Sequence, residues 1–345
     1  MSYGKYPDLK KVNKILVIKM RHHGDVLLSS PLFSVLKNRL PNAQIDAYIY
    51  EDTLPMLEGH PGIKNYFLYD RKWKQLSFLK KLGKELSLLW KLRKEKYDMV
   101  INLTEGDRGA IAAKFCNSPI RVGLDGKRKV YTHVVKYADK PRHTVEKHLD
   151  VLRVIGIFPT IHERDLTFII PKEAEKVVEI EDYILIHPVS RWMFKSPPPS
   201  FFIELIPELL KKGKKIALTS SPDPKEMAML EQIIGQIPPV YNFGGKTTLK
   251  ELGALVKKAS CLITVDSVPL HMASALKTPV IAIFGPTSET NWGPWMHPKA
   301  RVVAQNFPCR PCFKDGCAGS KLSDCLYTMR IENVLHAYDS LFKNS

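Results

Sequence analysis

The sequence predicts an α/β protein made of two Rossmann-like, doubly wound domains that face each other across a cleft. Short apolar runs alternate with amphipathic helical segments, the alternation restarts near mid-chain, and 345 residues exceed one ordinary core. A hydrophobic content of 44% suffices for two cores. We expect a first domain at 1–175, a second at 176–328, and a C-terminal helix at 329–345 that packs back toward the first domain.

The first half begins with an apolar strand at 14–20, followed by a helix whose leucines recur every four residues from Leu28 to Leu40. Ser30 and Pro31 mark the cap and first turn of that helix. Strands at 45–50 and 99–102 follow. A helix at 144–155 then ends at Gly156.

The second half starts at an apolar strand, 183–187, after a polar connector at 171–182. A strand at 215–219 comes next, and a helix begins at Thr248, where Glu251 completes a capping box. Two further apolar runs, 261–265 and 280–284, enclose a short helical segment. This spacing is typical of a parallel sheet.

The loop between the last two runs is the strongest functional signal in the chain. Asp266 and Ser267 follow an apolar strand directly, where open α/β sheets bind their ligands. Pro269 suits the first helical position, so the backbone N–H groups of Ser267 and Val268 are expected to face an anion. The unit therefore predicts a phosphorylated ligand.

Charge and targeting signals narrow the class of protein. Fifty-two Lys and Arg against 35 Asp and Glu give a net charge of +17, which favours anionic partners. No apolar run approaches the roughly 20 residues of a spanning helix, and the first residues lack the apolar core of a signal peptide. We therefore expect a cytoplasmic protein with reduced thiols.

Several common ligand motifs are missing from the sequence. It contains no G-x-G-x-x-G fingerprint, and Gly245-Lys246-Thr247 lacks the upstream glycine of a P-loop. No Asp-x-Asp pair is present to hold a diphosphate through a metal ion. A bound diphosphate would therefore be held by organic cations and backbone dipoles.

Two loops at predicted strand ends carry candidate site residues. Ser190, Arg191 and Lys195 follow the strand 183–187 and can meet phosphate oxygens; the alternative is a solvated basic loop. Asp25 follows the strand 14–20 and can accept a proton from a hydroxyl; the alternative is a helix N-cap. The preceding loop residues are weaker acceptor-binding candidates and can equally be ordinary polar side chains: Arg21, His22 and His23.

Taken in order, these segments resemble the ADP-heptose:lipopolysaccharide heptosyltransferase family, glycosyltransferase family 9. The resemblance runs from about Lys14 to Cys325 and is specific as an ordered set. Within the family, RHHGDVLLSSP and PCRPCFKDGCAGSKLSDCL are similar to the heptosyltransferase III branch, which adds the side-branch heptose of the inner core. The motifs that carry the resemblance are Gly24-Asp25 with Leu28 and Pro31, HPVSRWMFKSPP, Gly245 to Leu249, Val265-Asp266-Ser267 with His271, and Phe284 to Thr287.

The resemblance implies a GT-B fold and a metal-independent, inverting transfer of heptose from ADP-heptose to a lipopolysaccharide inner-core heptose. It implies no cofactor. Asp25 matches the family's catalytic carboxylate and Lys195 its diphosphate-binding lysine. Asp266, Ser267 and His271 match its nucleotide-sugar loop, and Thr247 falls where the family places adenine-side contacts. Ser190 and Arg191 are donor-side candidates from their loop alone. One departure is that Val268-Pro269 replaces a small glycine found in other branches.

Other functions remain open at this stage. Within the family, the chain could act at the first or second core heptose. From another class, a net charge of +17 fits a non-enzymatic anion- or nucleic-acid-binding protein, although no nucleic-acid motif is present. A nucleotide-sugar epimerase or dehydrogenase is disfavoured by the missing dinucleotide fingerprint.

Cysteines and one basic segment complete the sequence-based predictions. Cys116 and Cys261 lie in apolar settings and are expected in the core, whereas Cys309, Cys312, Cys317 and Cys325 have a spacing that could hold zinc or form disulfides. The segment 71–96 carries ten Lys or Arg among leucines and tryptophans. It is expected either to rest on the anionic cytoplasmic face of the inner membrane or to pack as an ordinary core helix with a solvated basic face.

Overall fold

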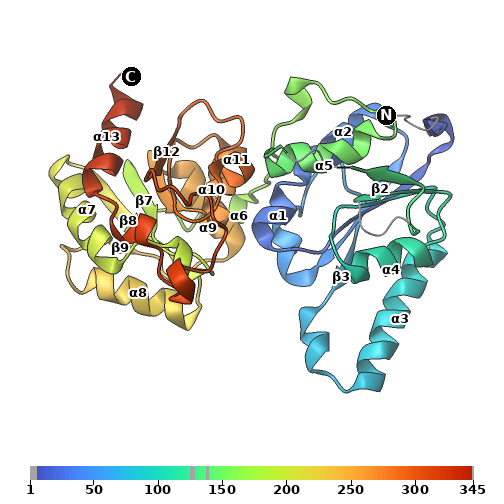
Figure 1. Cartoon of the computed structure of the whole chain (residues 1–345), viewed down its shortest axis with the longest axis horizontal. Coiled ribbons are helices and arrows are strands. Elements are labelled where there is room, and N and C mark those ends of the chain that lie inside the picture. The colour runs from blue at the N-terminus through green and yellow to red at the C-terminus, as the bar shows by residue number, and fades with distance from the viewer. Residues whose placement is uncertain (1–5, 125–128, 137–139, 344–345) are drawn as a thin grey trace. The chain divides into compact units, whose positions relative to one another are not determined.

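The computed structural model describes residues 6–124, 129–136 and 140–343. Its contacts divide the chain into two units, Met1–Ile169 and Ile170–Ser345. This boundary lies a few residues before the predicted 175/176. Each unit contains one six-stranded sheet with helices on both faces (Figure 1).

The sheet of the first unit is parallel throughout and has the order β3-β2-β1-β4-β5-β6. Strands β2 and β3 are added on one side of β1, and strands β4, β5 and β6 are then added on its other side. This is the Rossmann strand order, with its switch point between β1 and β4. The strands are β1 (Lys14–Lys19), β2 (Gln44–Tyr50), β3 (Asn65–Tyr69), β4 (Met99–Asn102), β5 (Ile120–Leu124) and β6 (His133–Val135).

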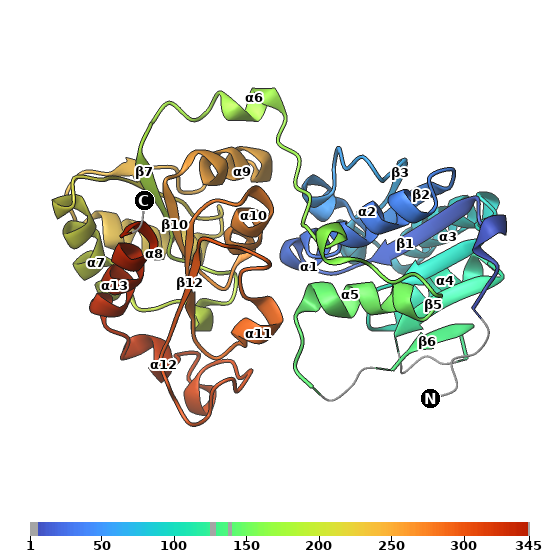
Figure 2. The same ribbon diagram turned by 90° about the horizontal axis from the view of Figure 1, so that it is seen from above.

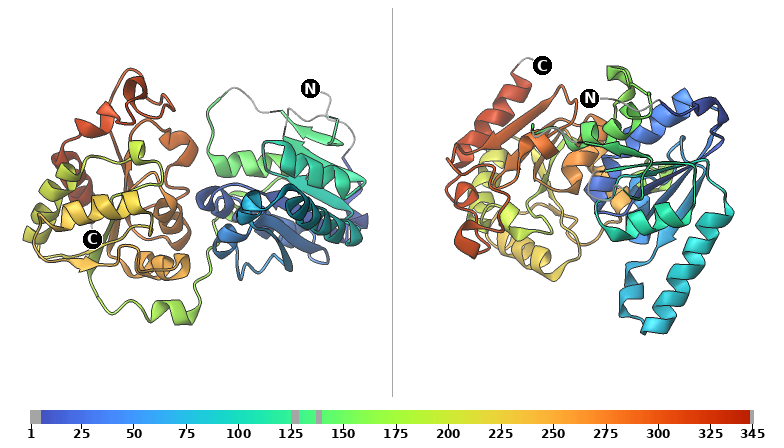
Figure 3. Two further views of the ribbon diagram at one scale, coloured as in Figure 1. Left: turned by 90° about the horizontal axis from the view of Figure 1, so that it is seen from below. Right: turned by 45° about the vertical axis from the view of Figure 1, so that its right-hand side comes forward.

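Helices cover both faces of this sheet. Leu16 and Ile18 of β1 share a buried cluster with Leu88 and Leu92 of α3 and with alanines of α4, while α2 and α5 pack on the opposite face (Figure 1). The start of α3 and the 3-10 turn η3 project beyond the sheet (Figure 3). The helical elements are η1 (Leu9–Lys11), α1 (His23–Leu27), α2 (Ser30–Arg39), η2 (Glu51–Met56), η3 (Arg71–Gln75), α3 (Phe78–Lys94), α4 (Asp107–Phe115), α5 (Thr144–Arg153) and η4 (Ile161–Glu163).

The second sheet repeats the same topology. Its order is β12-β11-β10-β7-β8-β9, again parallel throughout, with the switch point between β7 and β10. Strands β7 and β10 are buried at every position, as expected for central strands covered on both faces. The strands are β7 (Tyr183–His187), β8 (Lys215–Leu218), β9 (Tyr241–Asn242), β10 (Cys261–Val265), β11 (Val280–Phe284) and β12 (Ala300–Ala304).

The C-terminal helix differs from its prediction. Sequence analysis placed it against the first domain, but Val334, Tyr338 and Leu341 of α13 lie in the core of the second unit, where α13 packs beside α7 (Figure 2). Helices α9 and α10 cover the other face of that sheet. The helical elements are α6 (Lys172–Glu175), η5 (Met193–Lys195), α7 (Pro199–Lys211), α8 (Pro224–Ile234), α9 (Leu249–Lys258), α10 (Val268–Leu276), α11 (Glu289–Trp292), η6 (Cys317–Gly319), α12 (Asp324–Tyr327) and α13 (Ile331–Phe342).

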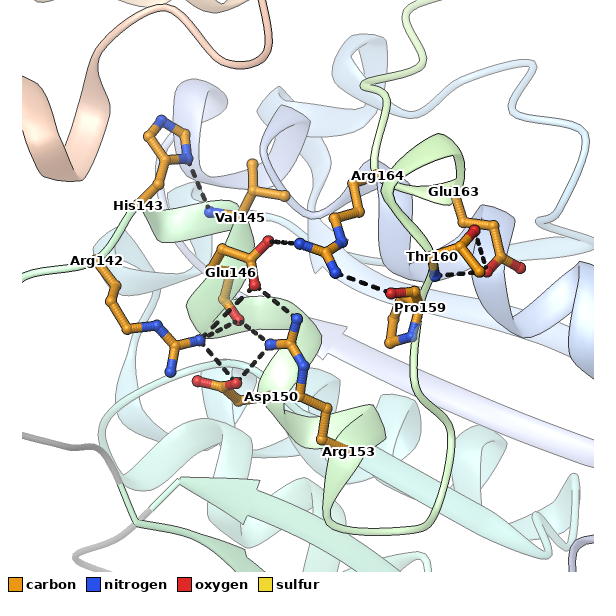
Figure 4. A network of polar contacts seen from close by, with 10 residues as sticks. All are labelled: Arg142, His143, Val145, Glu146, Asp150, Arg153, Pro159, Thr160, Glu163 and Arg164. Atoms are coloured by element: carbon orange, nitrogen blue, oxygen red, sulfur yellow. Dashed lines mark hydrogen bonds and ion pairs between the residues drawn. The ribbon is translucent and has the colours of Figure 1, made fainter.

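An ionic network fixes the segment that leaves the first unit (Figure 4). Asp150 of α5 binds Arg142 and Arg153, with N···O distances of 2.8 and 2.6 Å. Glu146, one turn earlier, binds Arg153 at 2.6 Å and Arg164 at 2.8 Å. Since Arg164 lies beyond the end of α5, these bonds tie the exit segment to the helix.

A buried carboxylate, Asp46 of β2, joins neighbouring strands of the first sheet. The backbone N–H and side-chain amide of Asn65 each donate to it at 3.1 Å, and the Tyr97 hydroxyl donates at 2.8 Å. Burial and the nearby carboxylate raise the pKa of Tyr97, so its hydroxyl keeps the proton that it donates. Asp46 thus has the hydrogen bonds that a buried charge needs.

We predict that Tyr97→Phe lowers the free energy of unfolding by about 1–3 kcal/mol, because a buried carboxylate loses one donor. Urea unfolding of the full chain measures this. Tyr327→Phe, at a side chain 43% exposed, is the matched control and should change little. Equal stability of Tyr97→Phe and the wild type would contradict the proposed importance of this bond.

Candidate functional site

The two switch points define two polar edges, one in each unit. In both sheets the neighbouring strands at the switch point send the chain to opposite sides, which leaves their carboxyl ends open for ligands. The loops after β1 and β4 form the edge of the first unit. The loops after β7 and β10 form that of the second unit.

Asp25 lies in the first turn of the short helix α1, directly after β1. It is not the N-cap of that helix, because His22 occupies the cap position. Its side chain is 22% exposed, and one carboxylate oxygen lies 4.0 Å from Nε of Arg21. Asp25 is therefore a partly exposed carboxylate beside one cation, as a proton acceptor for a substrate hydroxyl needs to be.

A buried lysine, Lys19, lies at the end of β1, just before the loop that leads to Asp25. The Lys19 ammonium, at the end of β1, donates to the Leu103 carbonyl at 3.2 Å and to Nε2 of His148 at 2.8 Å. The other ring nitrogen of His148 lies 3.1 Å from the Leu28 carbonyl, to which it donates. Burial lowers the pKa of Lys19 to about 8, and the Asp25 charge acts against that shift.

A hollow of about 330 Å³ lies beside Arg21 on the same edge. Arg108 of α4 lines it and donates to the Tyr50 hydroxyl at 3.2 Å, while its guanidinium lies 4.4 Å from the Tyr69 ring centre. The complete lining is Met20, Arg21, Tyr50, Thr104, Glu105, Gly106, Asp107 and Arg108. The lining of the hollow includes both positively and negatively charged side chains, which can hydrogen-bond to a sugar with polar substituents.

The other acceptor candidates take different places on this edge. The Arg21 carbonyl accepts from Arg71 at 2.8 Å, which fixes the loop. Nε2 of His23 lies 2.9 Å from the Asp52 carbonyl, so this ring holds η2 against α1. His22 caps α1 through its backbone position. Of the three predicted residues, only Arg21 lines the hollow.

The second unit gathers its predicted residues more tightly. Lys195, in η5 after β7, binds Oδ2 of Asp266 after β10 at 2.7 Å. The Thr287 hydroxyl, from the loop after β11, donates to the same oxygen at 2.8 Å. Asp266 is 6% exposed. Three loops therefore converge on one buried carboxylate, and Lys195 has further hydrogens to offer to an anion.

Ser190 and Ser267 lie beside this centre, and His271 follows on α10. The Ser190 hydroxyl lies 3.4 Å from the Asp266 carbonyl. Ser267 is the N-cap residue of α10, and its hydroxyl lies 3.0 Å from that of Thr264. His271 is buried one turn into α10. Pro269 is the second residue of α10 rather than the first, so the helix begins with Val268, directly after the N-cap Ser267.

Two donor-side candidates lie farther out. Arg191 is exposed, with its guanidinium 5.7 Å from the Trp192 ring centre. Thr247 lies in the loop after β9. In the sheet, β8 lies between β9 and β7, and the parallel strands end at the same edge. Thr247 and Arg191 thus share the edge with Lys195.

Sequence reasoning missed Thr287 and Trp292. Thr287 appeared only as the end of a Phe-Gly-Pro-Thr motif, and its bond to Asp266 joins residues 21 positions apart. The ring centre of Trp292, in α11, lies 5.9 Å from Nζ of Lys195, and the ring packs edge-on against Phe313. The signal for Thr287 was its position directly after a buried strand.

The cysteine-rich segment braces the same loops. Arg310 donates to the Gly285 carbonyl at 2.6 Å, Phe313 N–H to the Pro286 carbonyl at 2.9 Å, and the Ser323 hydroxyl to the Phe194 carbonyl at 2.6 Å. Burial raises the pKa of the Cys325 thiol to about 11, and the three other thiols of the segment act in the same direction. Within 6–124, 129–136 and 140–343, no group of three or more His, Cys, Asp or Glu is arranged to hold a metal ion. Cys116 and Cys261 are buried, as predicted.

Comparison with known proteins places the chain in a family. Residues 86–323 match glycosyltransferase family 9 (heptosyltransferase). A curated relative, lipopolysaccharide heptosyltransferase 3 of Escherichia coli, is 34% identical over 291 residues, covering 80% of this chain and 84% of the relative.

Solved structures agree on the fold. E. coli ADP-heptose lipopolysaccharide heptosyltransferase II superposes with a TM-score of 0.78 at 22% identity, covering 96% of this chain and 99% of that one. E. coli heptosyltransferase WaaC with ADP superposes with a TM-score of 0.74 at 18% identity, covering 95% of this chain and 99% of that one.

Two parallel Rossmann-like units and this family match define a glycosyltransferase. The chain belongs to glycosyltransferase family 9, the heptosyltransferases. The predicted α/β, GT-B fold class and the predicted enzyme class, a glycosyltransferase, are both confirmed.

We predict that Thr287→Val weakens ADP binding roughly tenfold, the size expected for losing one hydrogen bond to a charged group. Isothermal titration of the full chain with ADP measures the affinity, and Thr287→Ser should retain most of it. Thr278→Val is the matched control, because Thr278 is equally buried but donates to the Val256 carbonyl at the amino end of β11. Unchanged ADP affinity in Thr287→Val would contradict a role for Thr287 in ADP binding.

Proposed function

We propose that this protein transfers heptose from ADP-heptose to a heptose of the lipopolysaccharide inner core, as the side-branch heptose, with inversion at the anomeric carbon. The observation that carries the proposal is the convergence of Lys195, Asp266 and Thr287 at the second switch point. Relatives named for heptosyltransferase 3 support the choice of acceptor over the first or second core heptose.

The donor is proposed to bind at the carboxyl edge of the second unit. Lys195 has three hydrogens, so its ammonium can keep the 2.7 Å bond to Asp266 and still donate to a diphosphate oxygen. The dipole at the start of α10 adds partial positive charge beside it. Asp266 thus positions the lysine, and Thr287 in turn positions Asp266.

Asp25 is proposed as the general base. Its carboxylate takes the proton of the acceptor hydroxyl, and the hydroxyl oxygen forms a bond to the anomeric carbon of the heptose. The bond from that carbon to the ADP oxygen breaks, and ADP leaves with the electron pair. Attack from the side opposite to the leaving group inverts the configuration. Lys195 stabilises the negative charge that develops on departing ADP.

The acceptor is proposed to bind at the edge of the first unit, where Arg21, Tyr50 and Arg108 line the hollow next to Asp25. The mechanism requires Asp25 and Lys195 to act on the same pair of substrates. His22 and His23 remain proposed acceptor-side residues through the loop that they hold. Arg191 and Thr247 remain proposed donor-side residues at the outer part of the second edge.

Location follows from the proposed acceptor. A lipid-linked acceptor requires peripheral contact with the cytoplasmic face of the inner membrane, and we propose such contact. None of the helices within the described residues is both long and apolar enough to cross a bilayer. Nucleic acid is not part of the proposal, because the net charge of +17 is accounted for by anionic substrates and an anionic surface.

We predict that Asp25→Asn abolishes heptose transfer while ADP affinity stays within about twofold, because the amide cannot accept the proton although it has nearly the same shape. Transfer to a defined core acceptor is followed by mass spectrometry, and ADP binding by titration. Lys195→Met is the comparison variant: it should weaken ADP binding as well as slow transfer. Transfer by Asp25→Asn at the wild-type rate would refute the assignment of the base.

We also propose that the transfer needs neither a metal ion nor a cofactor. A chelator added in excess should leave the rate unchanged, because Lys195 and backbone N–H groups carry out the charge stabilisation that a metal would supply. Rate measurements with and without EDTA, and metal analysis of the purified protein, test this. A rate that falls with chelator and returns with added metal would overturn it.

A further inference from the structure

The helix α3 presents a large apolar stripe to solvent. Phe78 and Leu79 at its start are 75% and 78% exposed, and Trp90 near its end is 54% exposed. Leu82 and Leu86 complete the stripe, since residues four apart lie on one face of a helix. The buried residues of α3 are Leu88 and Leu92, which lie on the neighbouring face near its end, and Leu89 packs against the same cluster.

This exposure favours one of the two interpretations of the basic segment. An ordinary core helix would bury its apolar side and expose its polar side. Here the buried set is a narrow strip, and five large apolar side chains remain on the surface: Phe78, Leu79, Leu82, Leu86 and Trp90. Contiguous apolar surface rimmed by charge marks an interaction site.

The apolar surface continues onto α4. The Trp90 ring packs edge-on against Phe115, with ring centres 5.5 Å apart. Ile111, one turn earlier on the same face of α4, is 56% exposed. Figures 1 and 3 show the start of α3, together with η3, extending past the sheet of the first unit. The stripe therefore lies on a projecting element.

Positive charge borders the stripe. Two exposed lysines adjoin the apolar surface: Lys94 follows Trp90 by one turn on α3, and Lys114 follows Ile111 by three residues on α4. The two acidic residues of this segment are engaged elsewhere: Glu85 accepts from the Tyr69 hydroxyl at 2.6 Å, and Glu95 binds Lys14 at 2.7 Å. The border of the stripe is therefore strongly cationic.

We propose that α3 is a membrane-docking helix that inserts Phe78, Leu79, Leu82, Leu86 and Trp90 into the interface of an anionic phospholipid bilayer. The lysines beside the stripe meet the lipid phosphates, and their alkyl stems extend the apolar surface. Tryptophan at the stripe suits the headgroup region. A second copy of the chain is a poorer partner, because two such stripes would bring like-charged lysines together.

This inference names the surface for the membrane contact in the proposed function, and it does not depend on the transfer chemistry. The test is sedimentation of the full-length protein with vesicles of phosphatidylcholine, with and without phosphatidylglycerol. The wild type should bind the anionic vesicles, and binding should fall as salt rises. Phe78→Glu with Leu79→Glu should weaken binding at least about tenfold.

Two control variants isolate the stripe and its charge. Ile161→Glu with Val302→Glu makes the same charge change at side chains 51% and 43% exposed, and should bind like the wild type. Lys94→Gln with Lys114→Gln should weaken binding to anionic vesicles, whereas Lys176→Gln with Lys225→Gln, at exposed lysines of the second unit, should retain more of it.

A wild type that fails to sediment with anionic vesicles would overturn the proposal, as would equal binding by the Phe78 and Leu79 variant. A wild-type dimer that this variant dissociates, without vesicle binding, would assign the stripe to a second copy instead. Transfer to a water-soluble core oligosaccharide should be unchanged in the variant. If the wild type did not transfer heptose to the soluble oligosaccharide, the proposed function would be contradicted. The vesicle-binding result would still stand.

Discussion

The order of strands in two parallel sheets is the constraint on which this protein depends. In each unit the chain reverses direction between two central strands, and the loops after those strands separate at the carboxyl edge. Lys195 and Asp266 come from opposite sides of one such point, 71 residues apart in sequence and 2.7 Å apart in space. Hydrogen bonds between buried strands hold that geometry, because β7 and β10 pair directly.

The same topology serves two different chemistries. The edge of the second unit concentrates an ammonium, a buried carboxylate and a helix start, which together suit a diphosphate. The edge of the first unit offers a partly exposed carboxylate and a hollow lined by polar groups of both signs, which suits a sugar hydroxyl and its proton. The difference arises from loop residues, since the strands and their order are alike.

Sequence alone predicted the strands around both switch points, because apolar runs followed by Asp, Ser or Gly are distinctive. It also assigned Lys195, Asp266 and Ser267 to one site, largely through the ordered motifs. It did not predict the hydrogen bond from Thr287 to Asp266, which depends on the approach of a third loop. Nor did it predict that Val334 and Tyr338 of the C-terminal helix would enter the core of the second unit, because apolar periodicity shows that a face is buried and not which partner buries it. The exposed stripe of α3 was ambiguous for the same reason: a core helix and a membrane-facing helix share one pattern.

The central claim is that the nucleotide part of the donor binds at the second switch point, and hydrogen–deuterium exchange of the full-length protein with and without ADP tests it most directly. The account predicts that the strongest protection by ADP falls in three segments: the loop 188–196, the start of α10, and the loop that carries Thr287. Strongest protection at the amino ends of the second sheet, or at α7 and α13 on its face, would contradict the account.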